Sequence, residues 1–283
     1  MKKKTLFERS VNFLYTTCAG RTILKLLVNK QLSDVVGAFL NTKLSCFLIE
    51  PFIKRNHINM DEYEKVTYNS YNEFFYRNIA KGARVIPTDE TAFIAPCDSR
   101  LTAYPISDDM VVDVKDTRYS LRDLLKSNKL ANYYKGGTLL LFRLSVDDYH
   151  RYVYVESGEK SRNYRIPGVL HTVQPLANDV YPIYKENTRE FCLIKTPSIG
   201  SVLMMEVGAM LVGKIANENH HPAPVTRGQE KGHFEFGGST IIVCVKKGTL
   251  ELTEELKENS RNNIETKVKL GEIIGRKMIS LSQ

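Results

Sequence analysis

A change of texture near Arg84 is the feature that most constrains the fold. Beyond it, short runs rich in β-branched and aromatic residues alternate with Gly, Pro, Asn and Asp, which is the pattern of strands joined by turns. A mainly β, sandwich-like core is therefore expected over 81–283. The runs that we predict as its strands are 138–146, 152–156, 191–195, 201–207 and 240–246.

The residues before this core, 1–80, are expected to form a basic helical region. Apolar residues recur at three- and four-residue steps between Leu24 and Leu40, the spacing of a helix with one apolar face. A further helix is predicted where Ser70-x-x-Glu73 forms a capping box. No linker separates this region from the core, so we expect one packed α+β unit.

The charge of the chain is concentrated near its start. Residues 1–58 hold ten Lys and Arg against three Asp and Glu, a local balance of +7 out of a formal net charge of +8. A basic amphipathic segment suits an anionic membrane surface, where each nearby Lys or Arg contributes about 1 kcal/mol. A helix packed on its own domain with a solvated basic face fits equally well. No nucleic-acid partner is expected, because no binding motif appears.

Membrane spans and disulfides are not predicted. The apolar stretches between Ile23 and Ile53 are interrupted by charges, and the residues after Met1 build no secretion signal. The cysteines are odd in number and lack Cys-x-x-Cys spacing, which favours a reducing compartment. They are Cys18, Cys46, Cys97, Cys192 and Cys244.

Gly237-Gly238-Ser239-Thr240 is a candidate site of self-cleavage, set just before the predicted strand 240–246. Two glycines remove the Cβ barriers ahead of a hydroxyl, so the backbone can bend and expose the Gly238 carbonyl to Ser239. The same residues are also ordinary loop chemistry. A base near Ser239 is needed to favour cleavage.

His150 is the candidate base, because it follows the exit of the predicted strand 138–146 and an imidazole is a natural general base for a serine hydroxyl. Asp98, in a turn after the apolar pair Phe93-Ile94, is the candidate acid that orients it. Taken singly, Asp98 equally fits a turn cap and His150 a structural histidine.

Taken together, these three segments resemble the phosphatidylserine decarboxylase family. Phe236 to Thr240 is similar to the family's self-cleavage motif, Asp148 to Arg151 to its Asp-Tyr-His-Arg motif, and Ala95 to Asp98 to its Pro-x-Asp segment. The resemblance runs in order from about Tyr71 to the C-terminus. Departures occur at Val153, where some members carry a second His, and at Thr188, where the family usually has Glu.

The resemblance implies conversion of phosphatidylserine to phosphatidylethanolamine and carbon dioxide through a Schiff base with a pyruvoyl group made from Ser239. His150, held by Asp98, would deprotonate Ser239 for attack on Gly238. The precursor would then divide into a β chain, 1–238, and an α chain, 239–283, which stay together as a heterodimer. A homo-oligomer is left open.

The implied substrate also gives the basic region a purpose, namely peripheral attachment to the cytoplasmic side of the cell membrane. Tyr149 and His171 are candidates for lining the headgroup pocket, with packing as the alternative. No metal is expected. His220 and His221 would face opposite sides if they shared a strand. For His233, positioning the cleavage loop and simple exposure both remain open.

Two other functions are compatible with these residues. One is a non-enzymatic membrane-associated adaptor, in which the β sandwich binds a partner and Gly-Gly-Ser is only a hairpin loop. The other is a pyruvoyl-dependent decarboxylase of a soluble amino acid, which would share the processing but need no bilayer.

Overall fold

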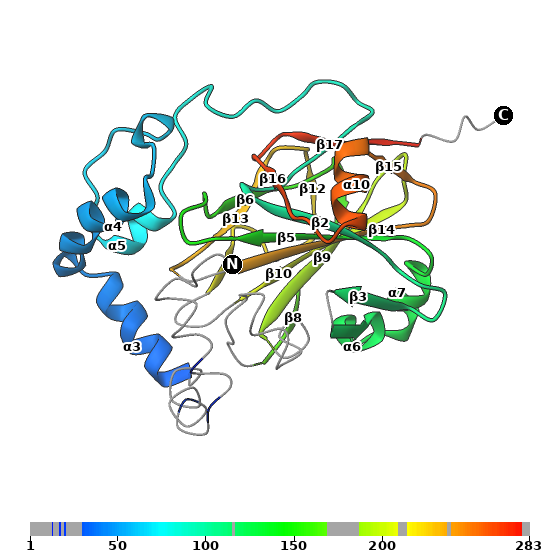
Figure 1. Cartoon of the computed structure of the whole chain (residues 1–283), viewed down its shortest axis with the longest axis horizontal. Coiled ribbons are helices and arrows are strands. Elements are labelled where there is room, and N and C mark those ends of the chain that lie inside the picture. Colours follow the sequence, from blue (N-terminus) through cyan, green and yellow to red (C-terminus); the bar gives the residue numbers. More distant parts are fainter. Residues whose placement is uncertain are drawn as a thin grey trace.

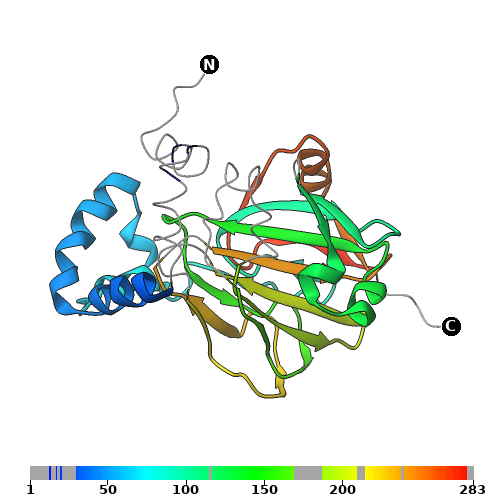
Figure 2. The same ribbon diagram turned by 90° about the horizontal axis from the view of Figure 1, so that it is seen from below.

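The computed structural model describes residues 30–114, 117–168, 187–208, 214–236 and 239–278, together with Phe13, Thr17 and Gly20. Its N-terminal helices lie beside one end of a core built of strands (Figures 1 and 2). The α+β class with a mainly β core is therefore confirmed. The division at residue 80 stays a prediction.

The helical region combines short α and 3-10 segments. The predicted amphipathic helix is confirmed as far as it is described, from Lys30. The Ser70 N-cap of the predicted capping box is confirmed, because its hydroxyl accepts a hydrogen bond of 3.1 Å from the Glu73 N–H at the start of a helix. The Glu73 carboxylate accepts from the Asn69 N–H instead of the Ser70 N–H, so the reciprocal half of the box is displaced by one residue. The elements are α3 (Lys30–Leu40), η1 (Lys43–Leu48), α4 (Ile49–Asn56), η2 (Met60–Glu62) and α5 (Tyr71–Phe75).

Among the described residues, a nine-stranded antiparallel sheet forms the centre of the core, in the order β12-β7-β9-β10-β14-β5-β2-β16, with β8 also paired to β9. Its strands are β2 (Ser99–Pro105), β5 (Thr138–Leu144), β7 (Gly158–Lys160), β8 (Tyr164–Ile166), β9 (Arg189–Lys195), β10 (Ser201–Val207), β12 (Ala223–Val225), β14 (Ser239–Val245) and β16 (Thr266–Val268).

Smaller sheets and helices complete the described core. The sheets are β1 (Ala92–Ile94) with β17 (Ile273–Lys277) and β15 (Leu250–Leu252), β11 (Ile215–Asn217) with β13 (Glu230–Phe234) and β6 (Arg151–Val153), and β3 (Val111–Val114) with β4 (Thr117–Ser120). The helices are α6 (Leu121–Leu125), α7 (Asn128–Tyr133) and α10 (Glu254–Arg261).

Strand β14 is buried along its whole length because both faces of the central sheet are covered. Its side chains alternate, as strand geometry requires. Ile242 packs with residues of α6 and α7 on one face, whereas Ile241 and Val243 pack with residues of β1, β6 and β13 on the other. The strand that begins with Ser239 thus lies between two hydrophobic layers.

A buried ion pair ties β13 to the central sheet. The Lys231 ammonium lies 2.7 Å from the Glu206 carboxylate of β10, and both side chains are fully buried. Burial alone would lower the pKa of Lys231, but the Glu206 carboxylate raises it and keeps the ammonium charged. Asn217 accepts a second hydrogen bond from Lys231. This pair holds the strand that leads toward Ser239.

The five predicted strands correspond to β5, β6, β9, β10 and β14, with ends shifted by up to three residues. The interpretation of His220 and His221 as neighbours on one strand is wrong, because both lie between β11 and β12. No helix among the described residues has the length and apolar character needed to cross a bilayer. The four described cysteines are free thiols.

We predict that Glu206→Gln lowers the free energy of unfolding by about 3–5 kcal/mol, because it leaves the Lys231 charge buried without a counter-charge. Equilibrium urea unfolding measures the loss, with Ser239→Ala in every chain compared so that each unfolds and refolds as one uncut polypeptide. The control is Glu50→Gln, since the Glu50–Lys54 pair is exposed on α4 and its loss should cost below about 1 kcal/mol. Equal losses in the two variants would contradict the structural role of the buried pair.

Candidate active site

Ser239 begins β14 and is fully buried. The antiparallel register places it opposite Leu144, the last residue of β5. The chain leaving β5 therefore turns away directly beside Ser239. Gly237 and Gly238, the other half of the candidate cleavage site, lie outside the described residues.

The turn after β5 is closed by a carboxylate. The Ser145 N–H donates a hydrogen bond of 2.7 Å to the Asp148 carboxylate, and the Asp148 N–H donates one of 3.0 Å back to the Ser145 carbonyl. Arg100 of β2 donates to both side chains. The Asp148 side chain reaches back three residues, as the N3 side chain of a capping box does, and this reciprocal closure fixes where the next residues point.

His150 lies two residues after this turn and immediately before β6. Its backbone carbonyl accepts a hydrogen bond of 2.9 Å from the Phe234 N–H at the end of β13. Five residues after Phe234 the chain reaches Ser239. The backbone pairings thus place His150 beside the path into the candidate cleavage site from one side, and beside the β5 exit from the other.

The His150 ring is oriented by a carbonyl group. Its Nδ1 lies 2.9 Å from the Asp148 carbonyl oxygen, and because a carbonyl only accepts, Nδ1 must carry the proton of the neutral ring. Nε2 is then the lone-pair nitrogen. This Nε2 is buried and has no hydrogen-bond partner among the described residues. A buried imidazole with a free acceptor nitrogen is the form that a general base requires.

Helix α5 connects His150, the candidate base, to the candidate cleavage site. The Phe75 ring lies 4.0 Å from the His150 ring, between centroids, and 5.1 Å from the Phe236 ring. The Phe236 N–H also donates a hydrogen bond of 3.2 Å to the side-chain oxygen of Asn72, which is fully buried. The helical region therefore holds the last described residue before Gly237 against the same aromatic ring as His150.

Burial sets the charge of the base. The apolar surroundings lower the pKa of His150 to about 3, the positive charge of Arg77 acts in the same direction, and the hydrogen bond to the Asp148 carbonyl opposes both. The imidazole is therefore neutral at physiological pH. The Nε2 lone pair is therefore free to accept a proton, while the same burial makes the ring a weaker base than an exposed imidazole.

Asp98 lies in the predicted turn between β1 and β2, but its carboxylate binds other groups. Arg84 donates to both oxygens, with Nε 3.1 Å from Oδ1, and the Leu270 N–H donates at 2.8 Å. The described residues show no hydrogen bond between Asp98 and His150. Asp98 instead lies near Asp148, where its charge contributes to raising the pKa of that carboxyl.

A cleft of about 180 Å³ lies between the helical region and the core. Tyr63, Arg84, Asp98 and Asp148 are among its lining residues. Burial is the main cause that raises the pKa of Asp148 to about 6. The cleft thus brings the predicted acid and the carboxylate that closes the His150 turn to one surface.

The two candidate headgroup residues have different outcomes. Tyr149 is buried and packs at 6.1 Å from the Tyr63 ring, so its packing role is established while its place in a headgroup pocket stays a prediction. His171 lies outside the described residues.

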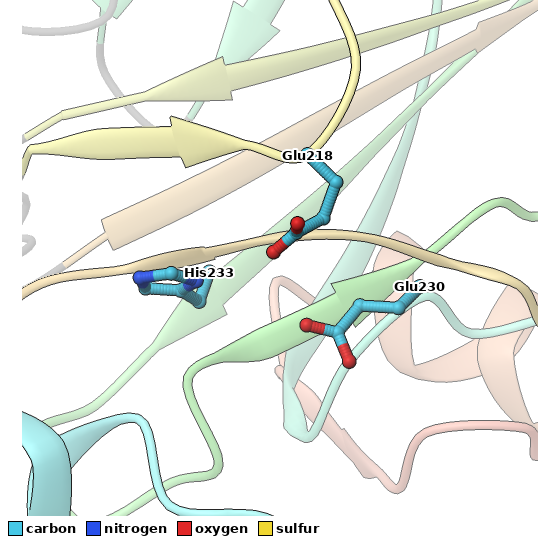
Figure 3. A group of neighbouring side chains, drawn as sticks. All are labelled: Glu218, Glu230 and His233. Carbon is cyan, nitrogen blue, oxygen red and sulfur yellow. The ribbon is translucent and has the colours of Figure 1, made fainter.

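Glu218, Glu230 and His233 form the group of potential metal ligands among the described residues, with one ligand atom of each within 4.8 Å of the others (Figure 3). Glu230 already pairs with Arg151. Burial, Arg151 and Lys214 lower the pKa of His233 to about 4, so positive charge already surrounds this group. We assign it no metal. The absence of a metal remains a prediction.

Residues that sequence reasoning missed surround the His150 ring. Arg77 and Phe75 come from the segment Phe74-Phe75-Tyr76-Arg77, next to the capping box that predicted the helix. The available signal was an arginine directly after an apolar helix turn. Nothing in the sequence indicated that α5 would pack against the β core at this point.

Comparisons with known proteins agree with this arrangement. A family model described as phosphatidylserine decarboxylase matches residues 71–276. The chain is 44% identical over 266 residues to phosphatidylserine decarboxylase proenzyme 2 of Clostridium acetobutylicum, covering 94% of this chain and 91% of that protein. It is 38% identical over 272 residues to a phosphatidylserine decarboxylase proenzyme of Ruminiclostridium cellulolyticum, covering 94% and 91%.

These matches make the chain an enzyme of the carboxy-lyase class rather than a non-enzymatic adaptor. More particularly, it belongs to the phosphatidylserine decarboxylase family. The match begins at Tyr71, so it includes α5 with the β core. The helix that packs on His150 is therefore part of the family unit.

We predict that His150 contributes a pH-dependent stability. Its pKa is about 3 when folded and about 6.5 when unfolded, so between these values the unfolded chain binds one more proton. The free energy of unfolding therefore rises with pH by up to about 1.4 kcal/mol per pH unit between these values. The stabilising contribution of His150 is complete above about pH 6.5 and is lost as the pH falls toward about 3.

Urea unfolding at several pH values tests this contribution, with His150→Gln compared to its parent in a Ser239→Ala background. The difference in the free energy of unfolding between His150→Gln and its parent should change across the pH range between the folded and unfolded pKa values of His150. His221→Gln, at an exposed position, is the control and should run parallel to the parent. A His150→Gln curve parallel to the parent would contradict a buried neutral imidazole.

Proposed function

We propose that this chain is a self-processing phosphatidylserine decarboxylase that acts through a pyruvoyl group made from Ser239. The observation that carries the proposal is the neutral, buried His150, whose Nδ1 is held by the Asp148 carbonyl beside the strand pair that bears Ser239. The proenzyme names of the related proteins agree with a precursor that is processed.

Self-cleavage begins with proton transfer from the Ser239 hydroxyl to Nε2 of His150. The serine oxygen attacks the Gly238 carbonyl, the peptide C–N bond breaks, and the proton passes to the released nitrogen. An ester joins the two residues. Loss of the Cα proton of residue 239 then breaks the C–O bond and releases Gly238 as a carboxylate. Tautomerisation and hydrolysis by water convert residue 239 to a ketone and free ammonia.

The residues around position 239 fit such a group. Ser239 is buried at the start of a fully buried strand, so a ketone formed there would be protected from bulk water. Once formed, the pyruvoyl group supplies a carbonyl for the substrate amine and an electron sink for decarboxylation. His150 is our candidate for returning a proton to the substrate carbon.

Asp98 is proposed to support the base. Its contacts with Arg84 and the Leu270 N–H, and its nearness to Asp148, favour an action through the turn that positions His150. Direct orientation of the imidazole would require a different side-chain arrangement. Either role makes Asp98 a residue whose loss slows processing.

Membrane attachment is proposed for the helical region. Large apolar side chains are exposed there, with Leu44 76% and Phe47 67% exposed on η1, and Phe39 also exposed at the end of α3. Lys43 adjoins them in the sequence. Exposed apolar side chains beside basic ones suit the interface of an anionic bilayer. The substrate would be phosphatidylserine that stays in that bilayer, on the cytoplasmic side of the cell membrane.

We predict two polypeptides, 1–238 and 239–283, in denaturing electrophoresis of purified protein. Mass spectrometry should find the smaller one lighter by one ammonia than a chain beginning with Ser239, and borohydride should reduce its ketone. Ser239→Ala and His150→Ala should remain uncut, and Asp98→Asn should be cut more slowly. Ser201→Ala, on the neighbouring β10, is the control and should be cut at the wild-type rate.

Processing of His150→Ala at the wild-type rate would overturn its assignment as the base. An intact wild-type chain would contradict self-cleavage altogether.

We predict that the double variant Leu44→Ser, Phe47→Ser binds phosphatidylserine vesicles about tenfold or more weakly, because burial of each such side chain contributes about 1.5–3 kcal/mol. Vesicle sedimentation measures binding. Activity on vesicles should fall while activity on a water-soluble short-chain phosphatidylserine is kept. The control is Ile264→Ser, because Ile264 is also exposed but belongs to the β-rich part of the chain and not to the helical region. Its binding should match that of the wild type. Activity on free serine but not on the lipid would favour a soluble amino-acid decarboxylase.

A further inference from the structure

Arg77 is a buried arginine without a counter-charge. Its side chain is 2% exposed, and no carboxylate among the described residues forms an ion pair with it. Nη1 donates weakly, at 3.4 Å, to the carbonyl groups of Phe74 and Phe75. Removing an unpaired charge from water costs several kcal/mol. An anionic partner would offset this cost.

The two remaining nitrogens of Arg77, Nε and Nη2, are buried and form no hydrogen bond of ordinary length with the described residues. The neutral Tyr63 hydroxyl approaches the Arg77 side chain but cannot compensate its charge. Nε and Nη2 form the side-on fork of the guanidinium, whose two parallel N–H groups match the two oxygens of an anion. Elsewhere in this chain the same fork does bind an anion. Nε and Nη2 of Arg84 hold Asp98, and those of Arg143 hold Glu265 at 2.8 and 2.6 Å.

Packing against aromatic rings explains the position of Arg77 but not its fork. The guanidinium lies 3.9 Å from the centroid of the Tyr63 ring and 5.0 Å from that of Phe74. A cation–π contact attracts the guanidinium to the ring faces but supplies no oxygen atoms to accept from its N–H groups. The rings therefore account for where the guanidinium lies and leave its charge without an anionic partner.

The fork belongs to the surroundings of the base. The Phe75 carbonyl that accepts from Arg77 is part of the residue whose ring packs at 4.0 Å on His150. Tyr68, whose ring packs on Phe74, adds a buried hydroxyl that also lacks a partner among the described residues. The buried donors of Arg77 and Tyr68 thus both lie against Phe74 of α5. Of the two, Arg77 is close enough to His150 for its charge to lower the pKa of that ring.

We propose that the Arg77 fork binds an anionic group of the phospholipid substrate, with Tyr68 as an additional donor. This inference rests on the proposed function and names a recognition residue for it. Phosphatidylserine offers two groups of suitable chemistry, the phosphodiester and the serine carboxylate, each with two oxygens for a bidentate pair. Binding either one would neutralise the buried charge and place the headgroup near His150.

The test uses mature wild-type enzyme and the variants Arg77→Gln and Arg77→Lys, with kinetics on short-chain phosphatidylserine. A hydrogen-bonded charged group contributes about 1.5–3 kcal/mol, so Arg77→Gln should raise KM about 10- to 100-fold with a smaller change in kcat. Arg77→Lys, which keeps the charge and loses the fork, should have a KM between those of the wild type and Arg77→Gln. If Arg77→Gln yields no mature protein, Arg77→Lys alone is compared with the wild type.

Inhibition by two short-chain phospholipids separates the possible anions. Phosphatidylethanolamine keeps the phosphodiester and lacks the carboxylate, and the methyl ester of phosphatidylserine has its carboxylate blocked. If the fork binds the phosphodiester, the variants should weaken inhibition by both. If it binds the carboxylate, inhibition by both should be unchanged while KM for phosphatidylserine rises. Either pattern supports the proposal.

The control is Arg227→Gln, because Arg227 donates to the Ala92 and Pro87 carbonyls and has a structural role. Its KM should stay within about twofold of the wild type, whatever its thermal stability. Unchanged KM and inhibition constants in both Arg77 variants would overturn the assignment of Arg77. A wild-type enzyme inactive on phosphatidylserine would instead contradict the proposed function, so the two failures are distinguishable.

Discussion

Two antiparallel pairings are the constraint on which the rest of the site depends. One pairs β14 with β5 and sets Ser239 opposite Leu144, and the other pairs β13 with the residues around His150. Because the segments leave these pairings toward the same edge, the turn after β5 and the approach to β14 are neighbours. The buried pair Lys231–Glu206 anchors β13 to the central sheet and so keeps this arrangement in place.

The helical region helps to build the candidate site. Through Asn72 and Phe75, α5 supplies the contact to the Phe236 N–H and the ring against His150. Arg77, two residues after the helix, supplies the buried positive charge. The apolar environment that makes His150 a neutral base also makes the unpaired Arg77 costly. A site of this kind is stable in the uncut chain only because packing over many residues offsets that cost.

The architecture and the motif residues could be predicted from the sequence, for physical reasons that differ between elements. The β-branched runs and the capping box at Ser70 are local signals, so β5, β9, β10, β14 and α5 could be predicted. The contact of α5 with His150 joins segments far apart in the chain, and the pairing of Asp98 with Arg84 spans 14 residues. Both lie beyond the few residues over which helix and strand periodicity acts, so no local pattern encodes them.

The central place of β14 bears on how the mature protein can come into being. The segment after Ser239 supplies β14 to the middle of one sheet, β16 to its edge and β17 to another sheet. As one chain, these strands find their neighbours within a single molecule, whereas two separate chains would pay the entropy of association and expose a long apolar strand while they searched. Under the proposed cleavage before Ser239, assembly therefore comes before scission. A mature protein that is denatured afterwards would lack the covalent connection that guided the precursor to its native arrangement.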